Sequence, residues 1–238
     1  FISRGYKAGG VNQEPNLSES NRIFEPEYIM NGEFGIKSYK NNFRNNLSIF
    51  YGQRLDQQVS ISSQQFPSDP NSFLFYKSNA TEGMIYGLEF DSKYYGDRYN
   101  AGLSIGLLET WVDDFEFDLG IGSIQKAGNR EMAMSPNLNG SISFLGYLRE
   151  DLYVNIVNTY KSEYYFSDSH DYKSSPYNLT NISVGYYFNN IEIKLWVRNL
   201  FNKVYETRGF YFGLKPPNFY DELFKSFGDP RQSGLSFN

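Results

Sequence analysis

The sequence has no cysteine and a single histidine, His170, among its 238 residues. The absence of cysteine excludes a disulfide framework, thiolate metal sites and a thiol nucleophile. A single histidine excludes metal sites built from several imidazoles. It also makes any serine–histidine–aspartate triad depend on one residue in a polar segment.

Long apolar runs and an excess of positive charge are also missing. No stretch approaches the roughly 20 apolar residues of a membrane-spanning helix. The net charge is −5 and the isoelectric point is about 5.1, so a nucleic-acid partner is not expected. The chain opens on Phe1 with neither a methionine nor a basic start, so we expect no signal peptide and a chain that is part of something longer.

Aromatic residues are abundant in a chain that is hydrophilic overall. They make up 18% of the residues, including 21 Tyr and 21 Phe, while the mean hydropathy is −0.54. This combination suits strands with one apolar and one polar face. Residues 191–198 show it: Ile191, Ile193, Leu195 and Val197 alternate with Glu192, Lys194, Trp196 and Arg198. The same alternation predicts about ten strands, the first a partial one at residues 1–7, and most of them about 10–18 residues long, beyond the usual mode of about 5–6.

The predicted connections fall into two classes that alternate along the chain. Short turns are predicted at 40–42, 96–97, 149–151 and 189–190, and long loops at 8–23, 62–77, 113–135, 167–175 and 207–228. A soluble β-sandwich that binds sugar through loop aromatics has no reason to sort its loops in this way. A transmembrane barrel does, because its turns are short on one side of the membrane and its loops long on the other. The apolar residues would then face lipid, and Trp111 would lie in the aromatic girdle at the loop end.

Five segments resemble motifs of TonB-dependent receptors, in the order of that family. They are "FEPEYIMNGEFGIKS" (24–38), "EGMIYGLEFD" (82–91), "AGNREMAMSP" (127–136), "VRNLFNKVYETRG" (197–209) and "GDPRQSGLSF" (228–237). The chain departs from the family pattern at Asp91, where a glutamate is usual, and at Asn238, where the family ends on an aromatic residue. The order of the five motifs over the whole chain strengthens the resemblance.

The resemblance implies an all-β fold: a transmembrane antiparallel up-and-down β-barrel. Residues 1–238 would supply about ten carboxy-terminal strands of a 22-stranded barrel whose plug domain and first strands are absent. The implied function is energy-coupled uptake of a scarce bulky nutrient (a ferric siderophore, haem, cobalamin or a glycan) across the outer membrane of a Gram-negative bacterium. Outer-membrane lipid, the protein's own plug domain and the TonB energy-coupling protein would be its partners. No catalytic residue, cofactor or metal is implied; the alternative is a passive porin or another non-transport barrel.

Two groups of candidate site residues follow. Loop side chains that could contact a ligand are His170, Tyr172, Phe210, Tyr211, Phe212 and Tyr220, although an exposed loop histidine and self-packed loop aromatics are simpler interpretations. Polar-face side chains that would line the lumen are Glu33, Lys37, Glu89, Lys194, Trp196 and Arg198. Lumen residues of barrels mostly tune selectivity, so contact with the plug and simple tolerance of charge both remain open.

Two of the long loops carry further patterns. Asp113, Asp114, Glu116 and Asp118 could hold Ca²⁺, but the EF-hand spacing is missing and a solvated acidic loop is favoured. Residues 218–228 predict a short amphipathic helix, with Asn218 as N-cap, Gly228 as stop, and Phe219, Leu223 and Phe227 on one side. Such a helix could either pack on its own loop or gate a ligand.

Overall fold

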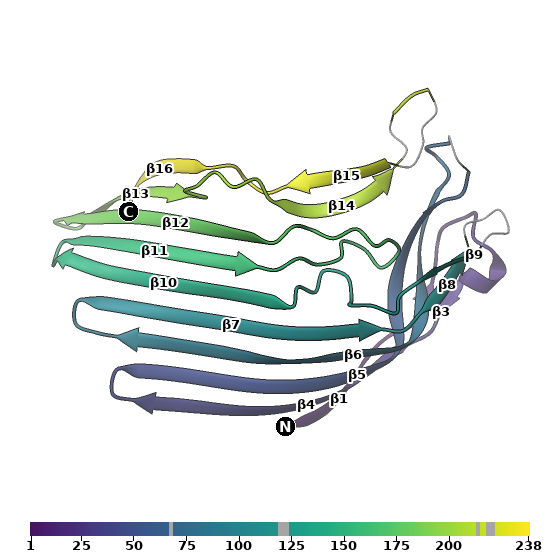
Figure 1. Ribbon diagram of the computed structural model, residues 1–238, viewed down its shortest axis with the longest axis horizontal. Helices are drawn as coiled ribbons and strands as arrows, with labels where there is room; N and C mark the ends of the chain where they lie inside the picture. Colours follow the sequence, from purple (N-terminus) through teal and green to yellow (C-terminus); the bar gives the residue numbers. More distant parts are fainter. Residues whose placement is uncertain (67–68, 119–123, 213–214, 218–221) are drawn as a thin grey trace.

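The computed structural model describes residues 1–66, 69–118, 124–212, 215–217 and 222–238, and nearly all of the regular structure in them is β-strand. Ten strands form one antiparallel sheet (Figure 1). In sheet order they are β1 (Ile2–Lys7), β4 (Glu27–Lys40), β5 (Phe43–Gln64), β6 (Phe73–Tyr95), β7 (Tyr99–Val112), β10 (Leu138–Arg149), β11 (Leu152–Lys161), β12 (Tyr177–Phe188), β13 (Ile191–Arg198) and β16 (Gln232–Phe237).

The remaining elements lie in the long connections. Three two-stranded sheets are formed by β2 (Gly10–Val11) with β3 (Ile23–Phe24), β8 (Phe115–Asp118) with β9 (Ile124–Ala127), and β14 (Glu206–Phe212) with β15 (Glu222–Phe227). One 3₁₀ turn, η1 (Glu19–Asn21), precedes β3. Among the described residues, no helix is long and apolar enough to cross a membrane.

The sheet confirms the predicted number of strands and their up-and-down order. Each strand of the sheet pairs with the next one along the chain, and the sheet stays open at β1 and β16. The strand lengths are less uniform than predicted. β5 has 22 residues and β6 has 23, about 70 Å at ~3.3 Å per residue. Because about 9–11 residues of a tilted strand cross a bilayer, these two strands continue well beyond the membrane-crossing part, through much of the segment predicted as the loop 62–77.

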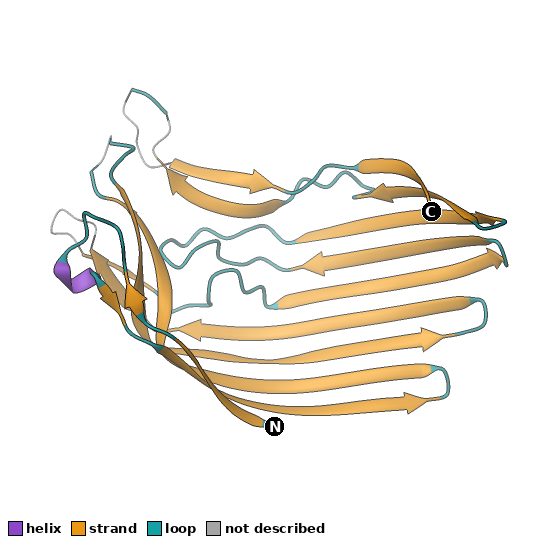
Figure 2. Cartoon of the chain, turned by 180° about the vertical axis from the view of Figure 1, so that it is seen from behind, coloured by secondary structure: helices purple, strands orange, loops and turns teal. Residues whose placement is uncertain are grey.

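Short turns lie at one end of the sheet and long connections at the other, as predicted. Figure 1 shows all four turns at the left, and Figure 2, from behind, shows the loops and the 3₁₀ turn η1 together at the opposite end. Asn41 and Asn189 adopt positive φ angles of 52° and 53° in two of these turns. Asparagine tolerates this left-handed conformation, which tight hairpins require.

The strand register joins the apolar faces of all ten strands into one belt. Directly paired residues in an antiparallel sheet project from the same face, so a belt can be followed from partner to partner. Leu235 pairs with Leu195, Leu195 with Val184, and Val184 with Val154. On the same face, among the amino-terminal strands, Leu107 pairs with Leu88, Leu88 with Ile49, and Ile49 with Phe34. Many belt residues are exposed, among them Phe34, Ile49, Leu107, Ile142 and Leu195. A continuous exposed apolar belt is what a lipid-facing wall needs.

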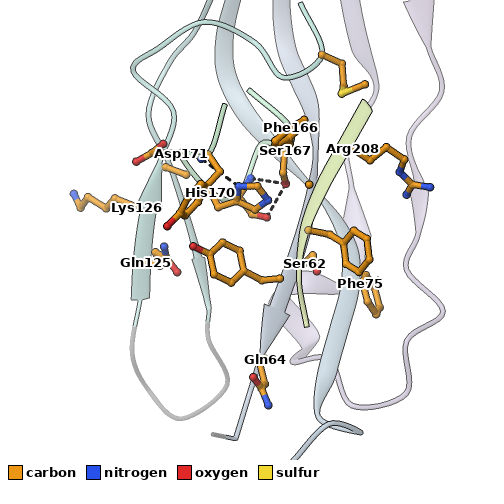
Figure 3. A pocket seen from close by; sticks show the side chains of 17 residues that line it. Ser62, Gln64, Phe75, Gln125, Lys126, Phe166, Ser167, His170, Asp171 and Arg208 are labelled. Carbon is orange, nitrogen blue, oxygen red and sulfur yellow. Dashed lines mark hydrogen bonds between the residues drawn. The ribbon is translucent and has the colours of Figure 1, made fainter. Parts of the chain in front are cut away.

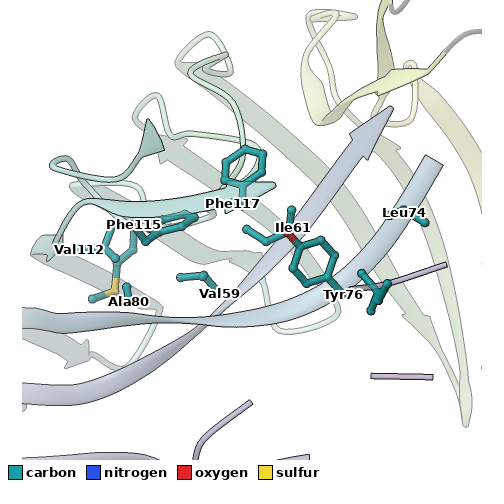
Figure 4. Packing of buried hydrophobic residues seen from close by; sticks show 10 residues of the cluster. Val59, Ile61, Leu74, Tyr76, Ala80, Val112, Phe115 and Phe117 are labelled. Atoms are coloured by element: carbon teal, nitrogen blue, oxygen red, sulfur yellow. The ribbon is translucent and has the colours of Figure 1, made fainter. Parts of the chain in front are cut away.

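The main cluster of buried apolar side chains lies at the loop end rather than in the body of the sheet (Figure 4). It combines the distal parts of β5 and β6 with the end of β7 and with β8. Its members are Leu17, Val59, Ile61, Leu74, Tyr76, Ala80, Val112, Phe115, Phe117 and Met132. The long connections are therefore packed on one another and on extended strands, which gives this end of the protein a core of its own.

The predicted helix at 218–228 is wrong where the structure can be compared. Glu222–Phe227 is strand β15, paired with β14, and the rings of Phe210 and Phe224 stack with centroids 6.1 Å apart. Residues 218–221 lie outside the described residues. The i, i+4 spacing of Leu223 and Phe227 fits a helix, but pairing with a distant strand decides the local structure.

Candidate functional site

A cavity of about 1060 Å³ lies among the long connections. Its walls come from β5, β6, β9, β14 and the loop between β11 and β12 (Figure 3). Gln125 and Lys126 stand on one side, Phe75 and Arg208 on the other, and His170 between them. Small-molecule sites usually measure about 300–1,000 Å³, so this cavity suits a bulky solute.

Aromatic rings form much of the wall. His170, Tyr172 and Tyr211 meet edge to face, with centroids 5.2 Å apart for His170 and Tyr211 and 5.5 Å for Tyr172 and Tyr211. Phe166 is buried and packs edge-on against Tyr164 at 5.8 Å. Rings fixed in this way can stack on a flat ligand without first losing much rotamer freedom.

Cationic side chains flank this aromatic wall. Lys126 Nζ lies 2.7 Å from Glu116 Oε1, and this hydrogen bond raises the pKa of the lysine. Arg208 is exposed and makes no ion pair with any residue in the described part of the chain. Asp171, which also lines the cavity, is 84% exposed and lies 3.0 Å from the buried Arg130. The cavity can therefore offer an unpaired guanidinium to an anionic ligand.

Arg130 holds the loop that supplies the centre of the wall. Its Nη2 donates to the carbonyl oxygens of Ser167, Asp168 and His170, at 2.8, 3.1 and 3.1 Å. Its Nε is at ion-pair distance from Asp171, but the N–H lacks the alignment of a hydrogen bond. The guanidinium also lies 4.0 Å from the centre of the Tyr165 ring.

His170 is half-buried, which corrects the expectation of an exposed loop histidine. Burial, reinforced by the positive charge of Arg130, lowers its pKa below the ordinary value of 6.5. The imidazole is therefore neutral at pH 7, and its Nδ1 accepts a hydrogen bond from the Tyr172 backbone at 3.4 Å. A neutral histidine in an aromatic wall can stack on a ligand, and because Nδ1 already accepts from Tyr172, its Nε2 carries the proton and can only donate.

The predicted ligand-contacting residues separate into three groups. His170, Tyr172, Phe210 and Tyr211 line the cavity together. Phe212 instead stacks on Phe73, with centroids 4.7 Å apart. Tyr220 lies outside the described residues. The sequence interpretation missed Phe166, Lys126, Arg208 and Arg130, although the last two stand in motifs that had been singled out.

All six residues predicted for the polar face lie on the side of the sheet opposite the apolar belt. The register shows this: Lys194 pairs with Gly185, Glu89 with Ser48, and Lys37 with Asn46. Glu33 accepts a hydrogen bond from Ser48 at 2.8 Å, and the Arg198 guanidinium lies 5.2 Å from the centre of the Trp196 ring. A second hollow, of about 780 Å³, includes Glu89 on this face.

The described side chains of the acidic segment 113–118 form no metal site. Its Glu116 pairs with Lys126, while Phe115 and Phe117 between the carboxylates are buried in the loop core. In the part of the chain that the structure describes, no three His, Cys, Asp or Glu side chains are grouped to hold a metal ion. The side chain of Asp118 lies outside that part.

The family model described as "TonB dependent receptor-like, beta-barrel" matches residues 2–200. Among solved structures, the ferric yersiniabactin uptake receptor FyuA from Yersinia pestis is 17% identical, with a TM-score of 0.75 over 99% of this chain and 33% of that one. The siderophore receptor PiuA from Acinetobacter baumannii is 16% identical, with a TM-score of 0.74 over 99% of this chain and 33% of that one. The copper transporter OprC is 14% identical, with a TM-score of 0.63 over 86% of this chain and 31% of that one.

At these identities the structures show a shared fold, and the chain spans about a third of their length. The family model covers most of the chain, and it confirms the resemblance inferred from the five motifs. The family consists of transporters rather than enzymes. The chain belongs to the TonB-dependent receptor family, with the fold of that family's β-barrel.

Proposed function

We propose that this chain is the carboxy-terminal part of an outer-membrane receptor that takes up a bulky metal chelate in a Gram-negative bacterium. The observation that carries the proposal is the large aromatic cavity at the loop end of a membrane-type β-sheet. Family membership and the exposed apolar belt support its placement in the outer membrane.

Uptake through such a barrel requires binding followed by an external energy source. A barrel wide enough for a bulky solute must be plugged to keep other solutes out, so binding energy has to come from the loops and the lumen wall. The outer membrane has no ATP, and the energy for moving the plug therefore has to come from an inner-membrane partner. The protein's own plug domain and the TonB protein are the partners that this reasoning proposes.

The chemistry of the cavity favours a chelate that carries aromatic rings and negative charge. Edge-to-face rings at His170, Tyr172 and Tyr211 offer stacking surfaces. Arg208 offers an unpaired positive charge in the lining of the same space, where Lys126 is already paired with Glu116. FyuA and PiuA, with which the chain shares its fold, are a ferric yersiniabactin and a siderophore receptor. Haem, cobalamin and glycans remain the competing ligands that an experiment has to separate.

Growth of a strain that lacks the full-length gene tests the proposal. The strain would be supplied with ferric yersiniabactin or ferric 2,3-dihydroxybenzoate as the sole iron source. Haemin, cyanocobalamin or maltoheptaose would be supplied in parallel cultures. We expect the intact gene to restore growth on a ferric chelate only, and an uncoupler of the proton gradient to abolish uptake. Growth restored on glycan or cobalamin alone would contradict the ligand class, and uptake insensitive to the uncoupler would indicate a passive porin.

Two matched variants connect that growth to the cavity. Tyr172→Ala removes an exposed ring from the aromatic wall, whereas Phe66→Ala removes an exposed ring from a neighbouring connection that does not line the cavity. Stacking on one aromatic side chain contributes about 0.5–1.5 kcal/mol, so Y172A should weaken chelate binding about 3- to 10-fold and F66A should leave it unchanged.

A further inference from the structure

We infer that Arg130 is the positioning residue of the binding cavity: it holds the segment 166–172 so that His170 and Tyr172 face the bound solute. The inference rests on the proposed function for its biological meaning, since the cavity is the proposed binding site. Its structural content can be tested without any ligand.

The contacts of Arg130 concentrate on one short segment. Three of its hydrogen bonds, at 2.8–3.1 Å, end on the carbonyls of Ser167, Asp168 and His170. That same segment supplies Phe166, Ser167, Ser169, His170, Asp171 and Tyr172 to the cavity wall. One planar guanidinium thus fixes the backbone beneath several wall residues, and charge-assisted hydrogen bonds of this kind are stronger than neutral ones.

Arg130 is itself tied to the sheet. Its carbonyl accepts a hydrogen bond from Val112 N at 2.9 Å, and its own N–H donates to Val112 O at 3.4 Å, which forms an isolated bridge to the end of β7. Its side chain is only 10% exposed. Through Arg130, the segment 166–172 is therefore anchored to a strand of the main sheet rather than to another loop.

A second cation, Lys173, also contacts the Tyr165 ring. Lys173 Nζ lies 4.3 Å from the centre of that ring and pairs with Glu131 at 3.1 Å and Glu163 at 3.2 Å. Lys173 forms ion pairs with side chains, whereas Arg130 donates to three backbone carbonyls of residues 167–170. Ser60 N also donates to the Asp168 side chain at 3.1 Å, but Arg130 contacts the backbone of this segment at more points. A lysine at position 130 would keep the charge, but its ammonium lies one bond nearer the backbone than Nη2, which makes all three carbonyl contacts, and it could not also keep the Nε contact with Asp171.

Hydrogen exchange of the full-length receptor in lipid nanodiscs measures directly how strongly Arg130 stabilises the segment 166–172 against local opening. Two amides report on the loop: Phe166 N donates to Tyr172 O at 3.0 Å, and Ser174 N donates to Tyr164 O at 2.9 Å. We expect Arg130→Gln to speed exchange of peptides covering 163–175 by about ten-fold or more, because local opening no longer breaks charge-assisted bonds. Arg130→Lys should give an intermediate increase.

Arg22→Gln is the matched control. Arg22 also holds a loop by donating to two carbonyls, those of Glu14 at 3.0 Å and Pro15 at 2.9 Å, but it does not line the cavity. Its replacement should speed exchange only near residues 14–22. Unchanged exchange at 163–175 in R130Q, or an equal change there in R22Q, would overturn the inference. If R130Q does not assemble, R130K decides alone, and unchanged exchange in that variant would overturn it as well.

The titration of His170 distinguishes positioning from general support of the fold. Besides Arg130, Asp171 acts on the imidazole and opposes the lowering of its pKa, and backbone hydrogen bonds at Gly209 and at His170 itself do the same. The His170 resonance of the labelled receptor is the one that disappears in His170→Asn. Loss of the Arg130 charge and of burial should both raise the His170 pKa toward its ordinary value in R130Q, but not in R22Q. A His170 pKa unchanged in R130Q would contradict the inference, whatever ligand the growth experiment identifies.

Discussion

Glu27 and Arg54 form a buried ion pair at the loop-side start of β4, and its removal should be costly. Glu27 Oε1 accepts from Arg54 Nε at 2.7 Å and from Nη2 at a still closer approach, and Glu27 Oε2 accepts from the Gln58 backbone at 2.9 Å. The side chains are 8% and 24% exposed, respectively. Glu27→Gln keeps the shape of the side chain, but it leaves the arginine without its counter-charge in a poorly hydrated place.

The exposed pair of Arg149 and Asp151 is a control of similar geometry. Arg149 Nε and Nη2 each lie 3.1 Å from an Asp151 carboxylate oxygen, but the side chains are 62% and 38% exposed. Breaking a buried pair on one side costs about 3–5 kcal/mol, and we expect about 2–3 kcal/mol for E27Q because Arg54 keeps some contact with water. Asp151→Asn should cost at most about 1 kcal/mol, as is usual for surface pairs.

Urea unfolding of the full-length receptor in detergent micelles, followed by tryptophan fluorescence, measures both variants against the parent. The free energy of unfolding should fall more for E27Q than for D151N by at least about 1 kcal/mol. Equal losses, or a larger loss for D151N, would refute the argument that burial rather than geometry determines the strength of these pairs.

Three further predictions concern the wall and the cavity. A Cβ at Gly185 would overlap the Tyr153 ring, whereas one at Gly32 would meet open space. Gly185→Ala should therefore lower the free energy of unfolding in urea by about 1–3 kcal/mol. A loss equal to or smaller than that of Gly32→Ala would contradict this. Leu195→Lys places a charge in the apolar belt and should cost about 2–4 kcal/mol in lipid; a neutral effect in refolding assays would argue against lipid contact. Because the folded loop lowers the pKa of His170, it favours the neutral imidazole. The stability that neutral His170 gives to the loop is therefore fully present above the unfolded pKa of 6.5, and it is lost as pH falls through the lower folded-state value. Exchange at 163–175, corrected for intrinsic rate, should accordingly rise as pH falls from 7 to 5.5, and His170→Asn should remove that dependence; a pH-dependent rise that persists in H170N would contradict it.

The wall was predictable because its determinants are local. Alternation along residues 191–198 places Leu195 and Lys194 on opposite faces in any extended strand, and a two-residue asparagine turn fixes where the next strand starts. The continuation of β5 past Ser62 was missed because serine and glutamine on both faces weaken the alternation. Just before that point, the burial of Val59 and Ile61 depends on β8, which is more than 50 residues away along the chain.

The cavity was only partly predictable because its walls come from five separate segments. Tyr211 and His170 were identified as loop aromatics, but nothing local indicates that their rings meet at 5.2 Å. The role of Arg130 depends on carbonyls 37–40 residues further along the chain. The helix predicted at 218–228 fails for the same reason, because Phe224 pairs with Phe210 across two strands.

Oxygen accessibility of spin labels along β13 tests the central claim most directly, namely that the apolar face of these strands contacts lipid. The chain has no cysteine of its own, so single cysteines can be placed at successive positions from 192 to 197 of the full-length receptor, freed of any other cysteine and embedded in a bilayer. We predict a period of two, with collision rates of the label with oxygen high at 193, 195 and 197 and low at 192, 194 and 196. Uniform rates, or maxima at the even positions, would contradict the account.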